Sequence, residues 1–221
     1  MIVVIGSPIG RLVDGHVAAW GAAAQTALAA AGAGRAVQLV GRIGDDPTAD
    51  GLLIDLARGH VGHVAVLRDP AQATPLAPAT TVDDDPSDVD SGEASADRPG
   101  SPAPGFALDA ADVELGLRYL TDFGVVVVAE PAGTAVLAVA AEAARWNDAV
   151  LILVVGQETV MPDGLPAGAI VFEAPSDDPD GAFAGLVGHF AAAIDDGADP
   201  GAAFRGALAD DGWTEAEAGD D

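Results

Sequence analysis

Short apolar runs alternate with longer helical patterns along most of the chain. The first run, Ile2 to Ile5, predicts a strand buried on both faces. A small-residue pattern over His16 to Ala31 predicts a helix that ends at Gly32, and Ala36 to Val40 predicts the next strand. The order strand, helix, strand is typical of an α/β protein.

The same alternation continues to the end of the sequence. The further predicted helices begin at Asp46-Pro47, Asp109, Thr134, Asp178-Pro179 and Asp199-Pro200, and the further predicted strands span His63–Leu67, Val125–Ala129, Ala149–Val155 and Ala169–Phe172. We therefore expect an α/β fold with a mostly parallel sheet and helices on both faces, in three layers.

A break in composition divides the chain. Residues 83–105 hold seven acidic residues and four prolines but no aromatic residue, which predicts a flexible linker or loop. Residues 1–82 and 106–211 are then the N-terminal and C-terminal parts of the same α/β domain. Residues 212–221 form an acidic tail.

The charge of the chain is strongly one-sided. It carries 35 acidic residues against 9 basic ones, all arginine, for a formal net charge of −26. Disorder is not expected, because 50% of the residues are hydrophobic and the mean hydropathy is +0.31. At molar salt the Debye length falls to about 3 Å and screens such self-repulsion. We interpret the acidic surface as an adaptation to concentrated salt, as in halophilic archaea.

The composition also limits partners and location. Without lysine clusters the chain is not expected to bind nucleic acids or anionic membranes. No apolar run is long enough to span a bilayer and no charged segment precedes the first strand, so we expect a cytoplasmic protein. The absence of cysteine excludes disulfides and thiolate chemistry. A small-molecule ligand and a homo-oligomer both remain compatible with the sequence.

Two segments carry a family resemblance. The stretch Gln38 to Pro47, in which a strand ends in a Gly-Asp-Asp turn before a helix, resembles the first signature region of the ribokinase-like (PfkB) carbohydrate kinases. The stretch Gly181 to Gly185 resembles the segment that follows the anion-hole motif of that family. The resemblance implies the ribokinase-like fold and a kinase that transfers the ATP γ-phosphoryl group to a sugar hydroxyl, with ATP and Mg as cofactors.

The resemblance also implies a catalytic site in which an Asp acts as base and helix N-terminal N–H groups hold phosphate. The four motif positions here are Asp178-Pro179-Asp180-Gly181, so Gly181 stands at the base position and Asp180 one residue earlier. The phosphate position corresponds to Asp178, Gly181 and Ala182. Pro179 lacks an N–H donor, and the Asp178 side chain is expected to take other donors as a helix cap.

The implied substrate side differs from the family pattern as well. The early substrate-binding Asp of the family corresponds to Arg11, and the Asn of its substrate loop corresponds to Gln25. These two residues are the candidates for contacts with an acidic or amide ligand. The alternative interpretation is a surface arginine and a glutamine on a helix face.

Two functions follow from these matches and mismatches. The first hypothesis is a non-catalytic relative of sugar kinases with a binding, regulatory or scaffolding role. The alternative is an active ATP-dependent carbohydrate or nucleoside kinase that uses Asp180 as base. A third hypothesis is a structural subunit of an oligomer, which requires an exposed apolar patch. No metal site is predicted, because His60 and His63 have no third ligand nearby.

Overall fold

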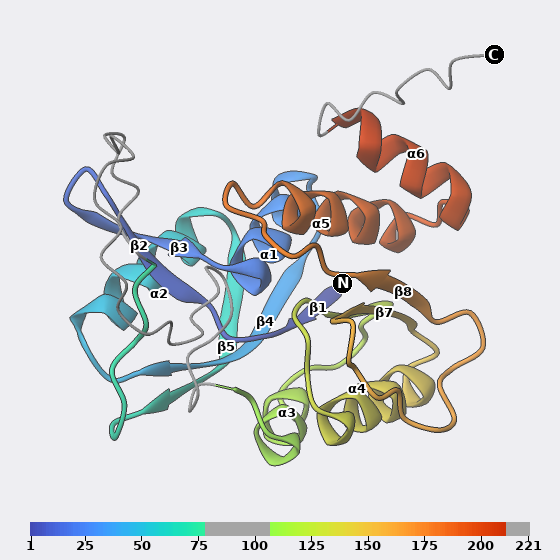
Figure 1. Ribbon diagram of the computed structural model, residues 1–221, viewed down its shortest axis with the longest axis horizontal. Helices are drawn as coiled ribbons and strands as arrows, with labels where there is room; N and C mark the ends of the chain where they lie inside the picture. The colour runs from blue at the N-terminus through green and yellow to red at the C-terminus, as the bar shows by residue number, and fades with distance from the viewer. Residues whose placement is uncertain (78–106, 211–221) are drawn as a thin grey trace, which may run out of the picture.

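The structure is a computed structural model of the 221-residue chain, and it describes residues 1–77 and 107–210. The predicted linker 83–105 and the acidic tail 212–221 lie outside the described residues. Figure 1 shows one layered α/β structure built from both parts of the chain.

A six-stranded sheet lies at the centre of the fold, and every strand pair in it is parallel. Its order is β5-β4-β1-β6-β7-β8. The strands are β1 (Ile2–Ile5), β4 (Val37–Gly44), β5 (Val61–Asp69), β6 (Val125–Val128), β7 (Val150–Val155) and β8 (Ile170–Glu173). The predicted parallel α/β sheet is confirmed.

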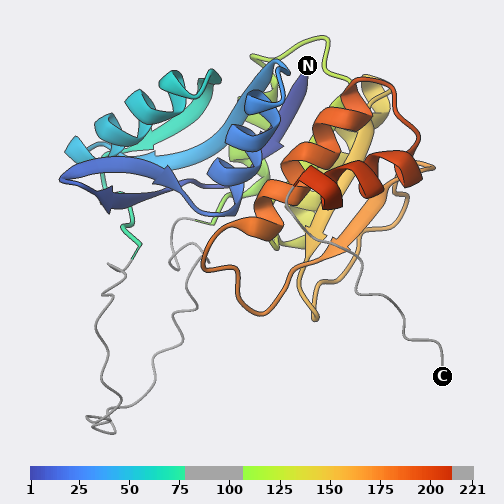
Figure 2. The ribbon, with the colours of Figure 1, turned by 90° about the horizontal axis from the view of Figure 1, so that it is seen from above.

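Helices cover both faces of this sheet (Figures 1 and 2). On one face lie α1 (Ala22–Gly32), α2 (Pro47–Arg58), α5 (Ala182–Asp195) and α6 (Pro200–Asp210), and on the other lie α3 (Ala110–Leu117) and α4 (Thr134–Trp146). Both faces of β1 are apolar, because successive side chains of a strand point to opposite faces. Ile2 and Val4 pack in the core on the side of α1 and α5, and Val3 and Ile5 pack in the core on the side of α3 and α4. None of the helices in the described part of the chain is long and apolar enough to cross a membrane.

The predicted helix over His16 to Ala31 is wrong in its first part. An antiparallel hairpin of β2 (Ile9–Val13) and β3 (His16–Trp20) precedes α1, which begins only at Ala22. The turn residues Asp14 and Gly15 have φ of 50° and 79°, as a two-residue hairpin turn requires. The Asp-Gly pair therefore outweighs the helical preference of the alanines that follow.

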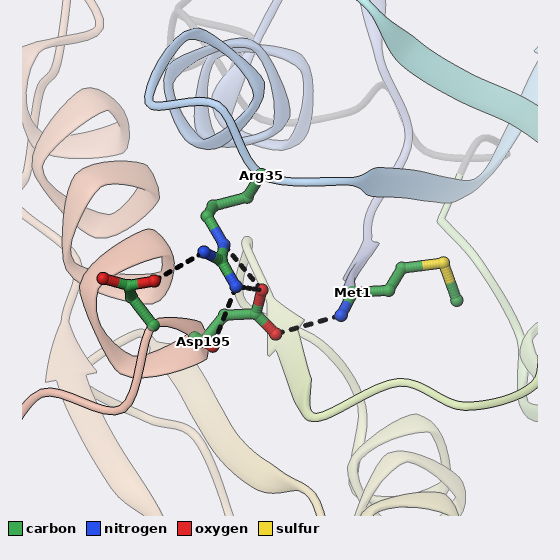
Figure 3. A network of polar contacts seen from close by, with 4 residues as sticks. Met1, Arg35 and Asp195 are labelled. Atoms are coloured by element: carbon green, nitrogen blue, oxygen red, sulfur yellow. Dashed lines mark hydrogen bonds and ion pairs between the residues drawn. The ribbon is translucent and has the colours of Figure 1, made fainter.

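A polar network joins the start of β1 to the far end of α5 (Figure 3). The Met1 amino group lies 3.0 Å from Oδ1 of Asp195, and the Arg35 Nε donates to Oδ2 of Asp195 at 2.8 Å. Arg35 also binds Asp196 at 2.7 Å. Burial by itself would raise the pKa of Asp195, but the hydrogen bond from Arg35 and the Met1 amino group outweigh it and lower the pKa. The network fixes α5 against the sheet.

Candidate functional site

A crevice opens between the carboxyl ends of β1 and β6. From β1 the chain builds the sheet outward through β4 to β5, and it then returns to add β6 on the other side of β1. The boundary between β1 and β6 is therefore the point where the strand order reverses. In open parallel sheets, ligands bind outside the carboxyl ends of the strands at this point.

Glu130 lies in this crevice, two residues after the end of β6. Its side chain is buried, with an exposed fraction of 7%, and its Oε1 accepts a hydrogen bond from the Ser7 backbone N–H at 2.9 Å. Burial raises the pKa of Glu130 from 4.5 to about 7, although the Ser7 N–H acts in the opposite direction. A buried carboxyl that titrates near neutral pH is a candidate for ligand or proton chemistry.

Gly6 allows the elements around Glu130 to approach one another. A Cβ atom at Gly6 would lie 2.7 Å from the Cβ of Ala23 and 3.2 Å from the Glu130 carboxyl carbon. No larger residue fits at Gly6 without movement of α1 or Glu130. The first turn of α1, the end of β1 and Glu130 therefore form one packed unit.

A cavity of about 70 Å³ adjoins this unit. Glu130 lines it together with Gly6, Leu108, the segment Pro131–Gly133 and Val136 of α4. The N-cap residue of α4, Gly133, provides no side-chain acceptor for the first N–H groups of that helix. The cavity has room for about two water molecules or one small polar group, and it is much smaller than pockets that enclose a whole ligand.

The predicted base and phosphate site, at the start of α5, differs from the predicted geometry. The helix begins at Ala182 rather than at Asp178, and its N-cap residue is Gly181 in the left-handed conformation, with φ of 72°. The Asp178 carboxylate nevertheless reaches the helix: Oδ1 accepts from Phe183 N and Oδ2 from Ala184 N, both at 3.1 Å. The carboxylate therefore takes two N–H donors of α5, as the sequence indicates, from outside the helix.

The remaining residues of this motif lie on the surface. The side chains of Pro179 and Asp180 are exposed, whereas Asp178 is half-buried. The Gly181 N–H donates to the Asp178 carbonyl oxygen at 3.2 Å. Three N–H groups around the start of α5 thus bind atoms of Asp178.

The structure brings Gln25 to this place as well. A Cβ atom at Gly181 would lie 3.1 Å from Cγ of Gln25, and the Gln25 Nε2 donates to the Ala19 carbonyl at 3.1 Å. In the next position, the Thr26 hydroxyl donates to the Ala184 carbonyl at 3.1 Å. Two of the predicted site positions, 156 residues apart in the sequence, are therefore neighbours in space.

Arg11 has a different environment. It lies in β2, and its guanidinium carbon is 4.2 Å from the centre of the Trp20 ring in β3. This distance is that of a cation–π contact within the hairpin. This contact places Arg11 on the hairpin rather than at the start of α5.

The Gly-Asp-Asp turn that carries the first resemblance has a structural role. A Cβ at Gly44 would lie 2.5 Å from the Gln72 carbonyl oxygen, so only glycine allows this approach. Asp46 caps α2 through the Ala49 N–H at 2.8 Å and also accepts from the Thr74 N–H at 2.6 Å. Burial opposes the charge of Asp46, yet these N–H bonds lower its pKa. The turn ties β4, α2 and the segment after β5 together.

Glu130 is the site residue that sequence reasoning missed. It comes two residues after the run Val125–Val128, and an acidic residue so soon after a fully buried parallel strand is placed at the ligand-binding edge of the sheet. The place of Glu130 after this strand was the feature of the sequence from which the site could have been predicted. Among residues 1–77 and 107–210, no group of three or more His, Cys, Asp or Glu side chains is arranged to hold a metal ion.

No family model matches the sequence, and no characterised protein matches it. Solved structures do match. A protein named Ribokinase II from E. coli is 14% identical, with 93% of this chain and 90% of that chain covered and a TM-score of 0.63. The PfkB protein from Polaromonas sp. JS666 is 15% identical, with 96% of both chains covered and a TM-score of 0.59.

A third structure, that of Sa239, is 12% identical, with 99% of this chain and 95% of that chain covered and a TM-score of 0.65. At these identities the matches establish architecture alone. The match extends over nearly the whole length of each chain, so it includes the sheet and both helical layers. The chain has the ribokinase-like α/β fold.

Proposed function

We propose that this chain is a member of the ribokinase-like (PfkB) family that has lost phosphotransfer and acts by binding a small molecule. The observation that carries the proposal is the Asp178 carboxylate on the Phe183 and Ala184 N–H groups. Free N–H groups at a helix N-terminus are what binds phosphate. In this chain an internal carboxylate holds them.

The electrostatics of the α5 start support the same conclusion. For phosphate to bind there, the Asp178 carboxylate would have to leave its hydrogen bonds, and the exposed carboxylates of Asp177 and Asp180 would remain nearby. Concentrated salt or a metal screens the repulsion between these carboxylates and a triphosphate, so the obstacle that remains is the occupation of the Phe183 and Ala184 N–H groups by Asp178. The residues present therefore do not fit ATP with Mg in the arrangement that the family resemblance implies.

The crevice at Glu130 is the proposed ligand site, in which the small cavity receives one polar group of the ligand rather than the whole molecule. It combines a buried carboxyl with one oxygen bonded to Ser7 N, a small cavity, and the uncapped start of α4. A carboxyl of this kind accepts a hydrogen bond from a hydroxyl or amine when ionised and donates one when protonated. The binding role extends to regulation or scaffolding if ligand occupancy alters a partner surface.

The proposal also includes the cellular location of the protein and the division of the chain into segments. The protein works in the cytoplasm of a cell with concentrated internal salt, where its acidic surface is screened and does not attract nucleic acids or membranes. Residues 1–82 and 106–211 act as one domain, joined by 83–105, with 212–221 as a tail. Each of these points rests on composition and charge.

The alternative is an active carbohydrate or nucleoside kinase with Asp180 as base. The fold favours it, because the Polaromonas sp. JS666 protein matched above is named a PfkB protein. The position of Gln25 beside Gly181 also favours it, since both correspond to site positions of the family. This alternative requires Asp178 to release the α5 donors when ATP binds.

One assay separates the two functions. ATP consumption is measured in concentrated KCl with a panel of sugars and nucleosides, for the wild-type chain and for Asp180→Ala. We expect no sugar-dependent or nucleoside-dependent consumption. Consumption that requires the sugar and disappears in Asp180→Ala would establish the kinase and refute the proposal.

A parallel thermal-shift screen tests the binding role. A ligand that binds only the folded chain raises its melting temperature, so the same panel identifies ligands without turnover. We expect a stabilising compound whose effect is reduced in Glu130→Gln. A compound that stabilises both chains equally would place its site elsewhere.

A further inference from the structure

The helices α3 and α4 lie on the face of the sheet opposite α1 and α5 (Figure 1), and side chains of both helices line a groove. Its volume is about 310 Å³. Leu120 and Phe123 are buried in its lining, and Leu117, Val139 and Ala143 form half-buried walls. We call it the α3–α4 groove. It is separate from the crevice that contains Glu130.

Trp146 stands at the edge of the α3–α4 groove. It is the last residue of α4, and 83% of it is exposed. Tryptophan is among the residues most enriched in the energetically dominant positions of protein interfaces. A largely exposed indole at the edge of an apolar groove indicates a surface that another molecule covers.

Two of the charged side chains that line the groove, Arg118 and Glu142, differ in whether they form an ion pair. Arg118 donates to the Glu114 carboxylate at 2.6 Å, one turn earlier in the chain. Glu142 lines the groove from α4 and forms no ion pair among the described residues. A guanidinium has five N–H donors, so Arg118 can bind a second carboxylate from outside.

We infer that the α3–α4 groove is the interface between two copies of this chain, in which Trp146 of each copy enters the groove of the other. A two-fold interface must be complementary to itself. This surface meets that condition twice: an exposed indole and apolar side chains line the same groove, and so do Arg118, which has N–H donors beyond those bound to Glu114, and the unpaired Glu142. In the dimer, Arg118 of one copy binds Glu142 of the other.

The effect of salt on binding distinguishes a second copy of this chain from a basic partner protein. Two chains of formal charge −26 repel each other at low salt and associate when salt screens the repulsion. A basic partner would be attracted at low salt and released as salt rises. The dimer therefore becomes tighter over the salt range in which a basic partner would dissociate.

The test is sedimentation of the full chain between about 0.1 M and about 1 M KCl, over which the Debye length falls from about 10 Å to about 3 Å. We expect the dimer fraction to rise with salt. Trp146→Ala should raise the dimer dissociation constant by at least about 30-fold, as for an interface residue of this importance. The matched control is Leu12→Ala, since Leu12 is also a large exposed apolar residue, on the hairpin. Circular dichroism verifies that each variant is folded.

A charge exchange tests the arrangement itself. Arg118→Glu and Glu142→Arg should each weaken the dimer, and an equal mixture of the two variants should restore it, because both cross-pairs then join opposite charges. A chain that is monomeric at every salt concentration overturns the inference and leaves the groove to a different occupant. A dimer that Trp146→Ala leaves intact, that Leu12→Ala dissociates, or that the mixture fails to restore overturns it as well.

Discussion

Replacing Glu130 with Gln should make the protein more stable, and increasingly so as the pH rises. The substitution keeps the shape of the side chain and an oxygen that can accept the Ser7 N–H, which lies 2.9 Å from Oε1. It removes only the ability to ionise. The effect on the free energy of unfolding therefore isolates the cost of a buried charge.

The magnitude follows from the pKa. In the folded chain the pKa of Glu130 is raised from 4.5 to about 7 by burial, so between these pH values the folded state holds a proton that the unfolded state has lost. The stability of the wild-type chain then falls as the pH rises through this window. At about 1.4 kcal/mol per pH unit, the loss amounts to about 3 kcal/mol above pH 7 and vanishes below pH 4.5.

Urea unfolding at constant high salt, followed by tryptophan fluorescence, measures this effect at a series of pH values. The comparison of interest is the difference between Glu130→Gln and the wild-type chain, in which the titration of all other acidic groups cancels. The matched control is Glu158→Gln, because Glu158 is an exposed carboxyl after β7. The pH-dependent difference is expected for Glu130→Gln, and the control shows whether the loss of any one carboxyl produces it.

Two results would refute the reasoning about Glu130. One is a difference between Glu130→Gln and the wild-type chain that is the same at pH 5 and above pH 7. The other is a variant that is less stable than the wild-type chain above pH 7, which would mean that the ionised carboxylate is stabilised by its surroundings. Either result would show that Glu130 does not titrate near neutral pH in the folded chain.

Two further substitutions test the contacts of α5. Arg35→Ala should lower the free energy of unfolding by about 1–3 kcal/mol at neutral pH, because it removes the bonds to the buried Asp195. The pKa of Asp195 is lowered on folding, so this loss of stability, measured by urea unfolding, should become smaller below about pH 4. Gly181→Ala should cost about 1–2 kcal/mol, because φ is 72° there, whereas Gly206→Ala in open space on α6 should stabilise. Equal effects of the two glycine substitutions would contradict the geometry.

The parts of the fold that sequence predicts best are those where one physical requirement dominates. Four consecutive valines, Val125 to Val128, favour a strand covered on both faces because the run is short and β-branched. The cap at Asp46 is indicated by Pro47 and the pattern after it. The segment from His16 fails because its alanines suit a helix, while the hairpin depends on pairing with β2 and on the turn at Asp14 and Gly15. Tertiary pairing is not visible in a local pattern.

The candidate sites show the same division. The residue type of Asp178 predicts that its carboxylate binds N–H groups at the helix start. That it reaches Phe183 and Ala184 depends on the left-handed turn at Gly181, which lies between Asp178 and those two residues in the sequence. Glu130 was missed because its importance comes from burial by Gly6, Ala23 and α4, and these segments are distant in sequence. Residue types indicate chemistry, whereas burial decides which of them is perturbed.

The measurement that tests the central claim most directly is the binding of ATP, by calorimetry in concentrated KCl, to the wild-type chain, Asp178→Ala and Asp177→Ala. If the Asp178 carboxylate occupies the α5 donors, the wild-type chain binds no ATP and Asp178→Ala gains measurable affinity. Asp177→Ala removes the same charge without freeing the donors, so it should gain much less. Binding of ATP by the wild-type chain that Asp178→Ala weakens would contradict the claim.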